Sequence, residues 1–141
     1  MLKGAYLHVL YADDIREETG DRISILGCSA NSSVMRIAEK PMQLKRLAIL
    51  GSLCVPHETE IRTLRIAIHE NKKLVAHHDV THLINEPDER MLENGEPINP
   101  RTFSFEFLLD GIVMHEPTLI AVSAFVNDIE INGTRLLITN E

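Results

Sequence analysis

The stretch HHDVTH, residues 77–82, holds three of the chain's seven histidines and an aspartate. Imidazole nitrogens and carboxylate oxygens are the usual ligands of zinc and related metals, so these residue types could form part of a metal site. On a helix, His78 and His82 would lie one turn apart and could share one ion. On a strand they would be about 13 Å apart, too far for a shared ion. The elements that carry the stretch therefore decide its chemistry.

The neighbouring sequence favours a strand. Val75, Val80 and Thr81 are good strand formers, and the polar run HENKK before them is typical of a turn. We therefore predict a strand over residues 74–84 that continues through His82.

On such a strand, His77 and Asp79 share one face and are the candidate metal ligands, with His69 of a neighbouring strand as the third donor. His78 would point to the opposite face, half-buried among apolar residues. We expect these histidines to serve the fold or the surface. The alternative is a metal-dependent enzyme or metal-binding protein centred on His77 and Asp79.

Other signatures of chemistry are sparse. The sequence contains no H-E-x-x-H, C-x-x-C, G-x-S-x-G, phosphate-binding loop or G-x-G-x-x-G motif, so we expect a protein that is not an enzyme and needs no cofactor. Cys28 and Cys54 are expected as free, half-buried thiols. Oxygen ligands for calcium are also present in the acidic residues near the first turn, in Asn127 and Asp128, and in the loop 86–96. The alternative is that these exposed segments are charged for solubility; the residues near the first turn are Asp13, Asp14, Glu17, Glu18 and Asp21.

Composition narrows the classes of partner. The 141 residues suit one domain, 1–141, and the net charge of −7 with a pI near 5.5 repels phosphate backbones and anionic membranes. No apolar run is long enough to span a bilayer, and the first residues lack a secretory signal pattern. We therefore expect a cytoplasmic protein that binds neither nucleic acid nor membrane.

Alternation with a period of two dominates the chain. In residues 102–110, Phe103, Phe105, Phe107 and Leu109 alternate with polar residues, which predicts a strand with one buried face. Three of the four phenylalanines lie on this face, so we expect it to form the centre of the core.

The dipeptide Asn132-Gly133 predicts a C-terminal hairpin, because Asn-Gly suits a type I′ turn. A two-residue turn there would set Ile131 opposite Thr134 and Glu130 opposite Arg135.

Other segments give the remaining strands. Residues 5–12 and 21–29 flank a turn at 18–21, and residues 44–55 are apolar on both faces, as in a strand buried between layers. Strands are also expected over 61–69 and 118–126. Residues 29–43 are expected as an edge strand or a crossover, and residues 85–100 as a loop with a short helix. The fold class is all-β: a single antiparallel β-sandwich, Ig-like or C2-like, of about eight strands.

The first hairpin resembles an uncharacterised family of small bacterial proteins. The shared pattern is Asp-Asp-Val/Ile-Arg, an acidic residue, a Gly-containing turn and then Ser-Leu-Ile-Gly; here it matches Asp13, Asp14, Ile15, Arg16, Glu17, Gly20, Ser24, Ile25, Leu26 and Gly27. A Pro before a Leu-rich strand, a Phe-rich strand and a closing hairpin follow in the same order. The chain departs from the pattern at CSANSS. The resemblance implies a β-sandwich and brings no activity, cofactor or site residue.

These observations together predict a non-enzymatic binding or adaptor domain that recognises a protein partner or assembles with itself.

Overall fold

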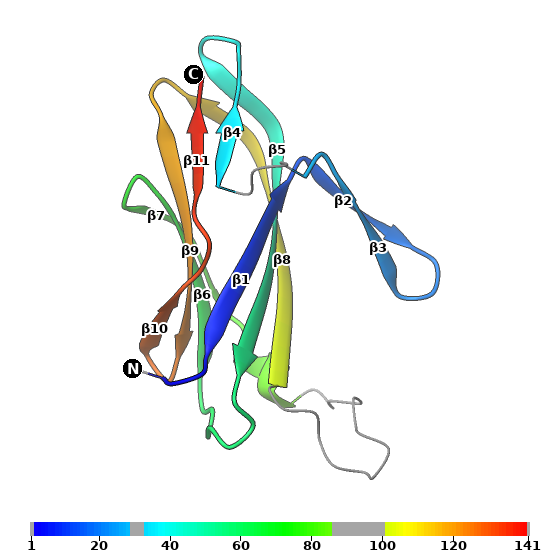
Figure 1. Ribbon diagram of the computed structural model, residues 1–141, viewed down its shortest axis with the longest axis vertical. Helices are drawn as coiled ribbons and strands as arrows, with labels where there is room; N and C mark the ends of the chain where they lie inside the picture. Colours follow the sequence, from blue (N-terminus) through cyan, green and yellow to red (C-terminus); the bar gives the residue numbers. More distant parts are fainter. Residues whose placement is uncertain (1, 29–32, 86–100, 141) are drawn as a thin grey trace.

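The computed structural model describes residues 2–28, 33–85 and 101–140, and the chain is all-β. Eleven strands and one 3-10 helix lie in these residues, where about eight strands were expected. The strands form two larger sheets and a separate two-stranded hairpin (Figure 1). No helix in the described ranges is long and apolar enough to cross a membrane.

The first sheet has three antiparallel strands. Its central strand β5 (Met42–Val55) lies between β1 (Tyr6–Ala12) and β8 (Arg101–Met114). Leu47, Ile49 and Leu53 on the inner face of β5 have no exposed surface. Apolar residues on both faces of this segment predicted a strand buried between layers, but on its outer face Leu50 and Ser52 are only half-buried.

The second sheet has six strands. The order along it is β4 (Val34–Arg36), β11 (Leu136–Thr139), β9 (Thr118–Val126), β6 (Leu64–Glu70) and β7 (Lys73–Asp79), and β10 (Ile129–Asn132) also pairs with β9. All pairs are antiparallel except β4 with β11. β4 is therefore the edge strand that was one of the two options for residues 29–43.

One hydrophobic cluster joins the two larger sheets. Val9, Ile49 and Leu53 of the first sheet belong to the same cluster as Ile66 and Ile120 of the second. Figure 1 shows the two sheets on opposite sides of the molecule. The all-β class is as predicted, and the two larger sheets share one aliphatic cluster.

The phenylalanine strand is not the centre of that core. Phe103, Phe105 and Phe107 share the inner face of β8, as predicted, but all three are only half-buried. β8 is an edge strand, so no further strand of the described chain covers its outer side. The fully buried side chains come instead from β1, β5, β6, β9 and β11.

The predicted Asn132-Gly133 turn is wrong. The C-terminal turn lies at Asn127 and Asp128, whose φ angles are 50° and 65°, and it joins β9 to β10. The φ of Gly133 is not positive, and its N–H donates to the carbonyl of Val122 (2.8 Å). β10 and β11 therefore follow the same edge of β9, and Ile131 does not pair with Thr134.

The absence of a side chain at Gly133 has a packing reason. A Cβ atom there would lie 2.7 Å from Cγ2 of Val9 and 2.9 Å from Cδ2 of Leu7. The Tyr11 hydroxyl also donates to the carbonyl of Thr134. Strand β1 of the first sheet passes against this part of the chain, so glycine serves a close approach of two segments.

The turn of the first hairpin lies where expected, with Gly20 and Asp21 at positive φ. The strands that it joins differ from those predicted. It pairs β2 (Asp14–Glu18) with β3 (Arg22–Leu26), whereas residues 5–12 pair with β5. The acidic run from Asp14 to Glu18 is thus a strand and not part of the turn. The loop and short helix expected at 85–100 fall on residues 86–100, which lie outside the described residues.

Candidate functional site: a groove beneath the first hairpin

The histidine stretch changes structure at Asp79. Strand β7 ends there, and the 3-10 helix η1 (Thr81–Asn85) follows. The Asp79 carboxylate accepts a hydrogen bond from the backbone N–H of Thr81 (2.9 Å), which competes with continued strand pairing. The strand prediction is therefore right for His77 and His78 and wrong for His82.

The structure places His77 and Asp79 on one face of the second sheet, with Arg65 beside them. Arg65 is paired with Asp79 across the strands, and its Nη1 lies 3.4 Å from Nε2 of His77. Its Nη2 donates to Asp128 at 2.7 Å. Hydrogen bonds from Thr81, and then the charges of Arg65 and His77, lower the pKa of Asp79. A cation is thus already built into this cluster.

The third candidate ligand is not brought to the pair. His69 lies on β6 opposite Leu74, beyond a register shift between the two strands, whereas His77 lies opposite Ala67. In residues 2–28, 33–85 and 101–140, no group of three or more His, Cys, Asp or Glu side chains is placed to hold a metal ion. This bears on the zinc-type site considered from the sequence, whereas the calcium-type site included residues 86–96, which lie outside the described residues.

His78 is exposed, where half-burial was expected. β7 is the last strand of its sheet, so no other described strand pairs with its outer edge. The ring of His78 stacks on Phe107 of the first sheet, with 4.7 Å between ring centroids. The thiols also differ from expectation: Cys54 is buried in β5, Cys28 is exposed, and no disulfide joins them.

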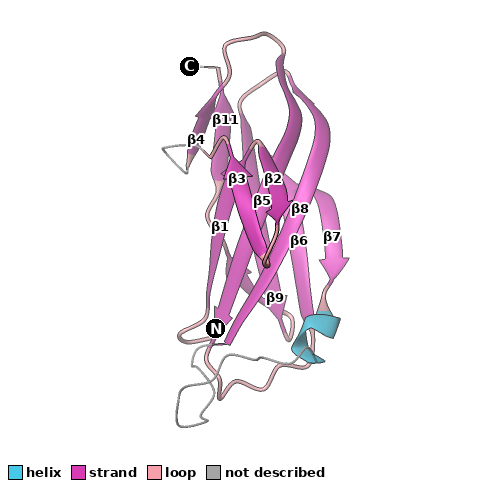
Figure 2. Ribbon diagram, turned by 90° about the vertical axis from the view of Figure 1, so that its right-hand side faces the viewer, coloured by secondary structure: helices cyan, strands magenta, loops and turns pink. Residues whose placement is uncertain are grey.

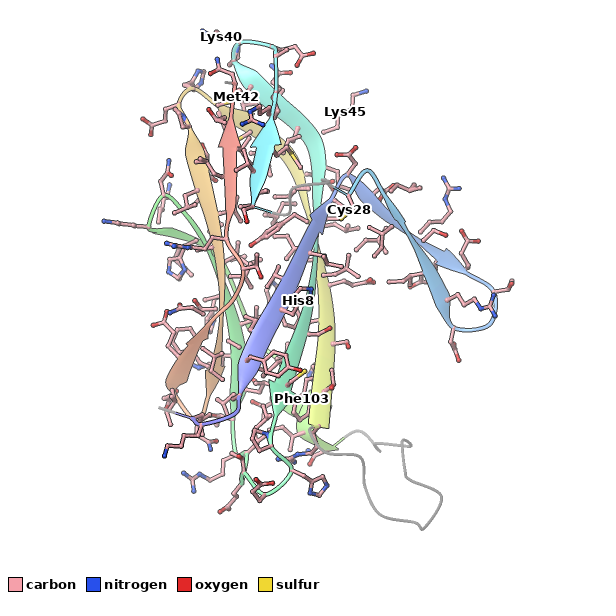
Figure 3. The ribbon with its side chains drawn as sticks, in the orientation of Figure 1. His8, Cys28, Lys40, Met42, Lys45 and Phe103 are labelled. Carbon is pink, nitrogen blue, oxygen red and sulfur yellow. The ribbon has the colours of Figure 1, made fainter. Side chains whose placement is uncertain are left out.

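A more distinctive feature is the β2–β3 hairpin, which leaves the body of the protein. Figure 1 shows it diverging from β1, and Figure 2 shows it standing in front of the outer face of the first sheet. Figure 3 places Cys28 at its base and His8 on β1. Asp13 donates from its backbone N–H to the carbonyl of Leu26 (2.9 Å), so the two ends of the hairpin are joined.

Ion pairs fix the hairpin at its base. Arg46 of β5 donates from Nε to Asp110 of β8 (2.7 Å) and from Nη1 to Asp14 of β2 (3.2 Å). The backbone N–H of Ile15, and then Arg46, lower the pKa of Asp14. The base is therefore held while the rest of the hairpin extends away from the sheet.

One face of the hairpin is largely apolar. Ile15 is directly opposite Ile25, and Glu17 is opposite Ile23, so these four side chains point to the same side. Ile23 and Ile25 are 47% and 37% exposed. An isolated two-stranded hairpin is marginally stable in water, so an exposed apolar face on one is a cost that a partner would remove.

Between this face and the first sheet lies a groove of about 440 Å³, which we call the hairpin groove. Ile23 lines its hairpin side. Two rows of residues across the outer face of the sheet line the other side: His8, Ser52 and Ser104 in one row, and Leu10, Leu50 and Glu106 in the next. The outer face is thus apolar at its centre, with hydroxyl groups on one side and a carboxylate at the β8 end.

The sequence contained a signal for this site that we missed. Residues DIREE and RISIL alternate as two short strands, and their apolar positions lie on one face only when the two are paired with each other. The sequence-based prediction instead sets residues 5–12 and 21–29 on either side of the turn at 18–21. No sequence pattern shows that the resulting hairpin stands off the sheet.

The chemistry of the hairpin groove suits binding. Its volume lies in the range of ordinary ligand sites, and its lining combines aliphatic side chains with a few polar groups. Comparison with known proteins adds nothing to this geometry: no protein-family model matches the chain, and no curated protein sequence matches it.

Proposed function

We propose that the protein is a non-enzymatic binding domain that holds a polypeptide segment of a protein partner in the hairpin groove. One observation carries the proposal: the exposed isoleucine face of the β2–β3 hairpin stands over an apolar stretch of sheet with about 440 Å³ between them. A segment entering this space would bury both surfaces at once. Removing apolar surface from water is favourable by about 25 cal/mol per Å² of buried area.

The groove lining supports a binding role over a catalytic one. Its titratable groups are His8 and Glu106, which lie in different rows on the two outer strands, β1 and β8. We also place the protein in the cytoplasm, in keeping with two cysteines that are not joined to each other.

The test uses a random twelve-residue peptide library displayed on phage and selected on the purified protein. We expect the selected peptides to lose most of their affinity for the Ile23→Asp variant, because the substitution puts a charge on the apolar wall of the groove. The matched control is Ile129→Asp, which makes the same change at another exposed isoleucine, on β10. The control should bind as the unaltered protein does.

Two results would contradict this function. One is a selection that yields no binding peptides, and the other is a set of peptides that bind the Ile23→Asp variant as well as they bind the unaltered protein. Circular dichroism of both variants checks that neither substitution unfolds the sheets.

A further inference from the structure

One carboxylate lines the hairpin groove, and a second lies on the hairpin face that borders the groove. Glu106 lines the sheet side, in the same row as Leu10 and Leu50. Glu17 is the direct cross-strand partner of Ile23, so its side chain points to the groove side of the hairpin. In the part of the chain that the structure describes, no ion pair holds either carboxylate.

The nearby arginines do not neutralise these two groups. Arg16 and Arg22 of the hairpin are paired with Ser24 and Glu18, and these four residues point to the face opposite that of Ile23. Arg46 is engaged by Asp14 and Asp110 at the base of the hairpin. His8 is the one nitrogen-bearing side chain among the groove-lining residues.

A segment bound in this groove therefore lies next to two carboxylates. Filling the groove with an apolar segment removes water from Glu106 and Glu17, and burying an unpaired charge is costly. A Lys or Arg beside the apolar residues would replace the lost water with a charge-assisted hydrogen bond. Resting on the binding function proposed above, we infer that the partner segment is basic as well as apolar, and that Glu17 and Glu106 select it.

Charge also distinguishes this occupant from a second copy of the chain. A second copy would bring its own net charge of −7 against a groove lined by the Glu106 carboxylate. Like charges brought together across an interface cost free energy and slow association. A basic segment of another protein is attracted by the same field.

The experiment begins with the peptides selected on the unaltered protein. We expect most of them to carry Lys or Arg within two residues of an apolar residue. Replacing those Lys or Arg residues with Gln should weaken binding about tenfold or more. Raising NaCl from about 50 to about 500 mM should weaken the basic peptides and leave the Gln peptides nearly unchanged, because salt screens exposed charges.

Glu17→Gln combined with Glu106→Gln gives the decisive variant. It should bind the basic and the Gln peptides with nearly equal affinity, because the apolar walls remain and only the charge is removed. Glu58→Gln, an exposed carboxylate in the loop between β5 and β6, is the matched control and should keep the preference for basic peptides.

The outcomes separate the two proposals. Peptides that depend on Ile23 but show no preference for Lys or Arg would overturn this inference and leave the binding function standing. The same holds if the double Gln variant keeps the preference. Concentration-dependent dimerisation that Ile23→Asp abolishes, measured by sedimentation, would overturn the inference in favour of a second copy. Failure to select any peptide would overturn both proposals.

Discussion

Gly51 of β5 must be small because the Phe105 ring of β8 occupies the space beside it. It pairs with Phe105 across the strands, and a Cβ atom on it would overlap the Phe105 ring. We expect Gly51→Ala to lower the free energy of unfolding by about 1–3 kcal/mol, because the crowded ring must leave its position. Urea denaturation measures the change. In a Phe105→Leu background the same substitution should cost clearly less, and an equal cost in both backgrounds would contradict the explanation.

Gly133 is small for a different reason from the one the sequence suggested. In a type I′ turn, Asn would be tolerated there because it readily adopts positive φ. Since Gly133 instead faces Val9 and Leu7, we expect Gly133→Asn and Gly133→Ala both to destabilise the fold by about 1–3 kcal/mol. Thermal denaturation of the two variants distinguishes these explanations. Tolerance of Asn together with loss of stability for Ala would favour the turn.

At the level of elements, the attachment of the β2–β3 hairpin depends on the protonation of Asp14. Its carboxylate accepts hydrogen bonds from the N–H of Ile15 (2.8 Å) and from Arg46 (3.2 Å), and these lower its pKa in the folded protein. Because the folded-state pKa lies below the unfolded-state value of about 3.9, the ionised form stabilises the attachment above that value. The stabilisation is lost as the pH falls through the folded-state pKa.

Carboxyl ¹³C NMR tests this attachment directly. In Arg46→Gln, the pKa of Asp14 should rise but remain below its ordinary value, because the bond from Ile15 is the larger cause of the lowering. Arg22→Gln is the control, since Arg22 lies at the far end of the hairpin opposite Glu18. An unchanged Asp14 titration in Arg46→Gln would show that Arg46 does not hold the hairpin.

At the scale of the whole molecule, the hairpin and the two larger sheets are separable. No residue of 14–26 belongs to the hydrophobic cluster that joins the sheets. Asp13 and Leu26 are already hydrogen-bonded, so Asn-Gly can replace residues 14–25 and close the gap. We expect this shortened chain to unfold cooperatively, with a free energy of unfolding within about 2 kcal/mol of the unaltered protein, and to lose peptide binding.

Circular dichroism and urea denaturation measure the first expectation, and the selected peptides measure the second. Loss of cooperative unfolding would mean that the hairpin is part of the core. Peptide binding that survives the excision would place the binding surface elsewhere.

The sequence by itself determined which residues share a face. Alternation predicted the common face of Phe103, Phe105 and Phe107. Glycine and aspartate in 18–21 predicted the first turn. These features follow from local geometry, because successive side chains of a strand point to opposite sides and few residues adopt positive φ. The all-β class follows from the same alternation.

Only the tertiary structure decided which strands pair and which faces are covered. Asn127-Asp128 and Asn132-Gly133 can both form a tight turn by sequence. The turn forms at Asn127-Asp128, and Gly133 instead packs closely against Val9. The metal hypothesis depended on whether His69 would lie beside His77 and Asp79, and no such group is placed to hold a metal ion in the described residues. Such choices depend on contacts between segments far apart in the chain, whose free energies do not appear in any local pattern. The hairpin groove arises in the same way, because alternation fixes the apolar face of the hairpin but not its distance from the sheet.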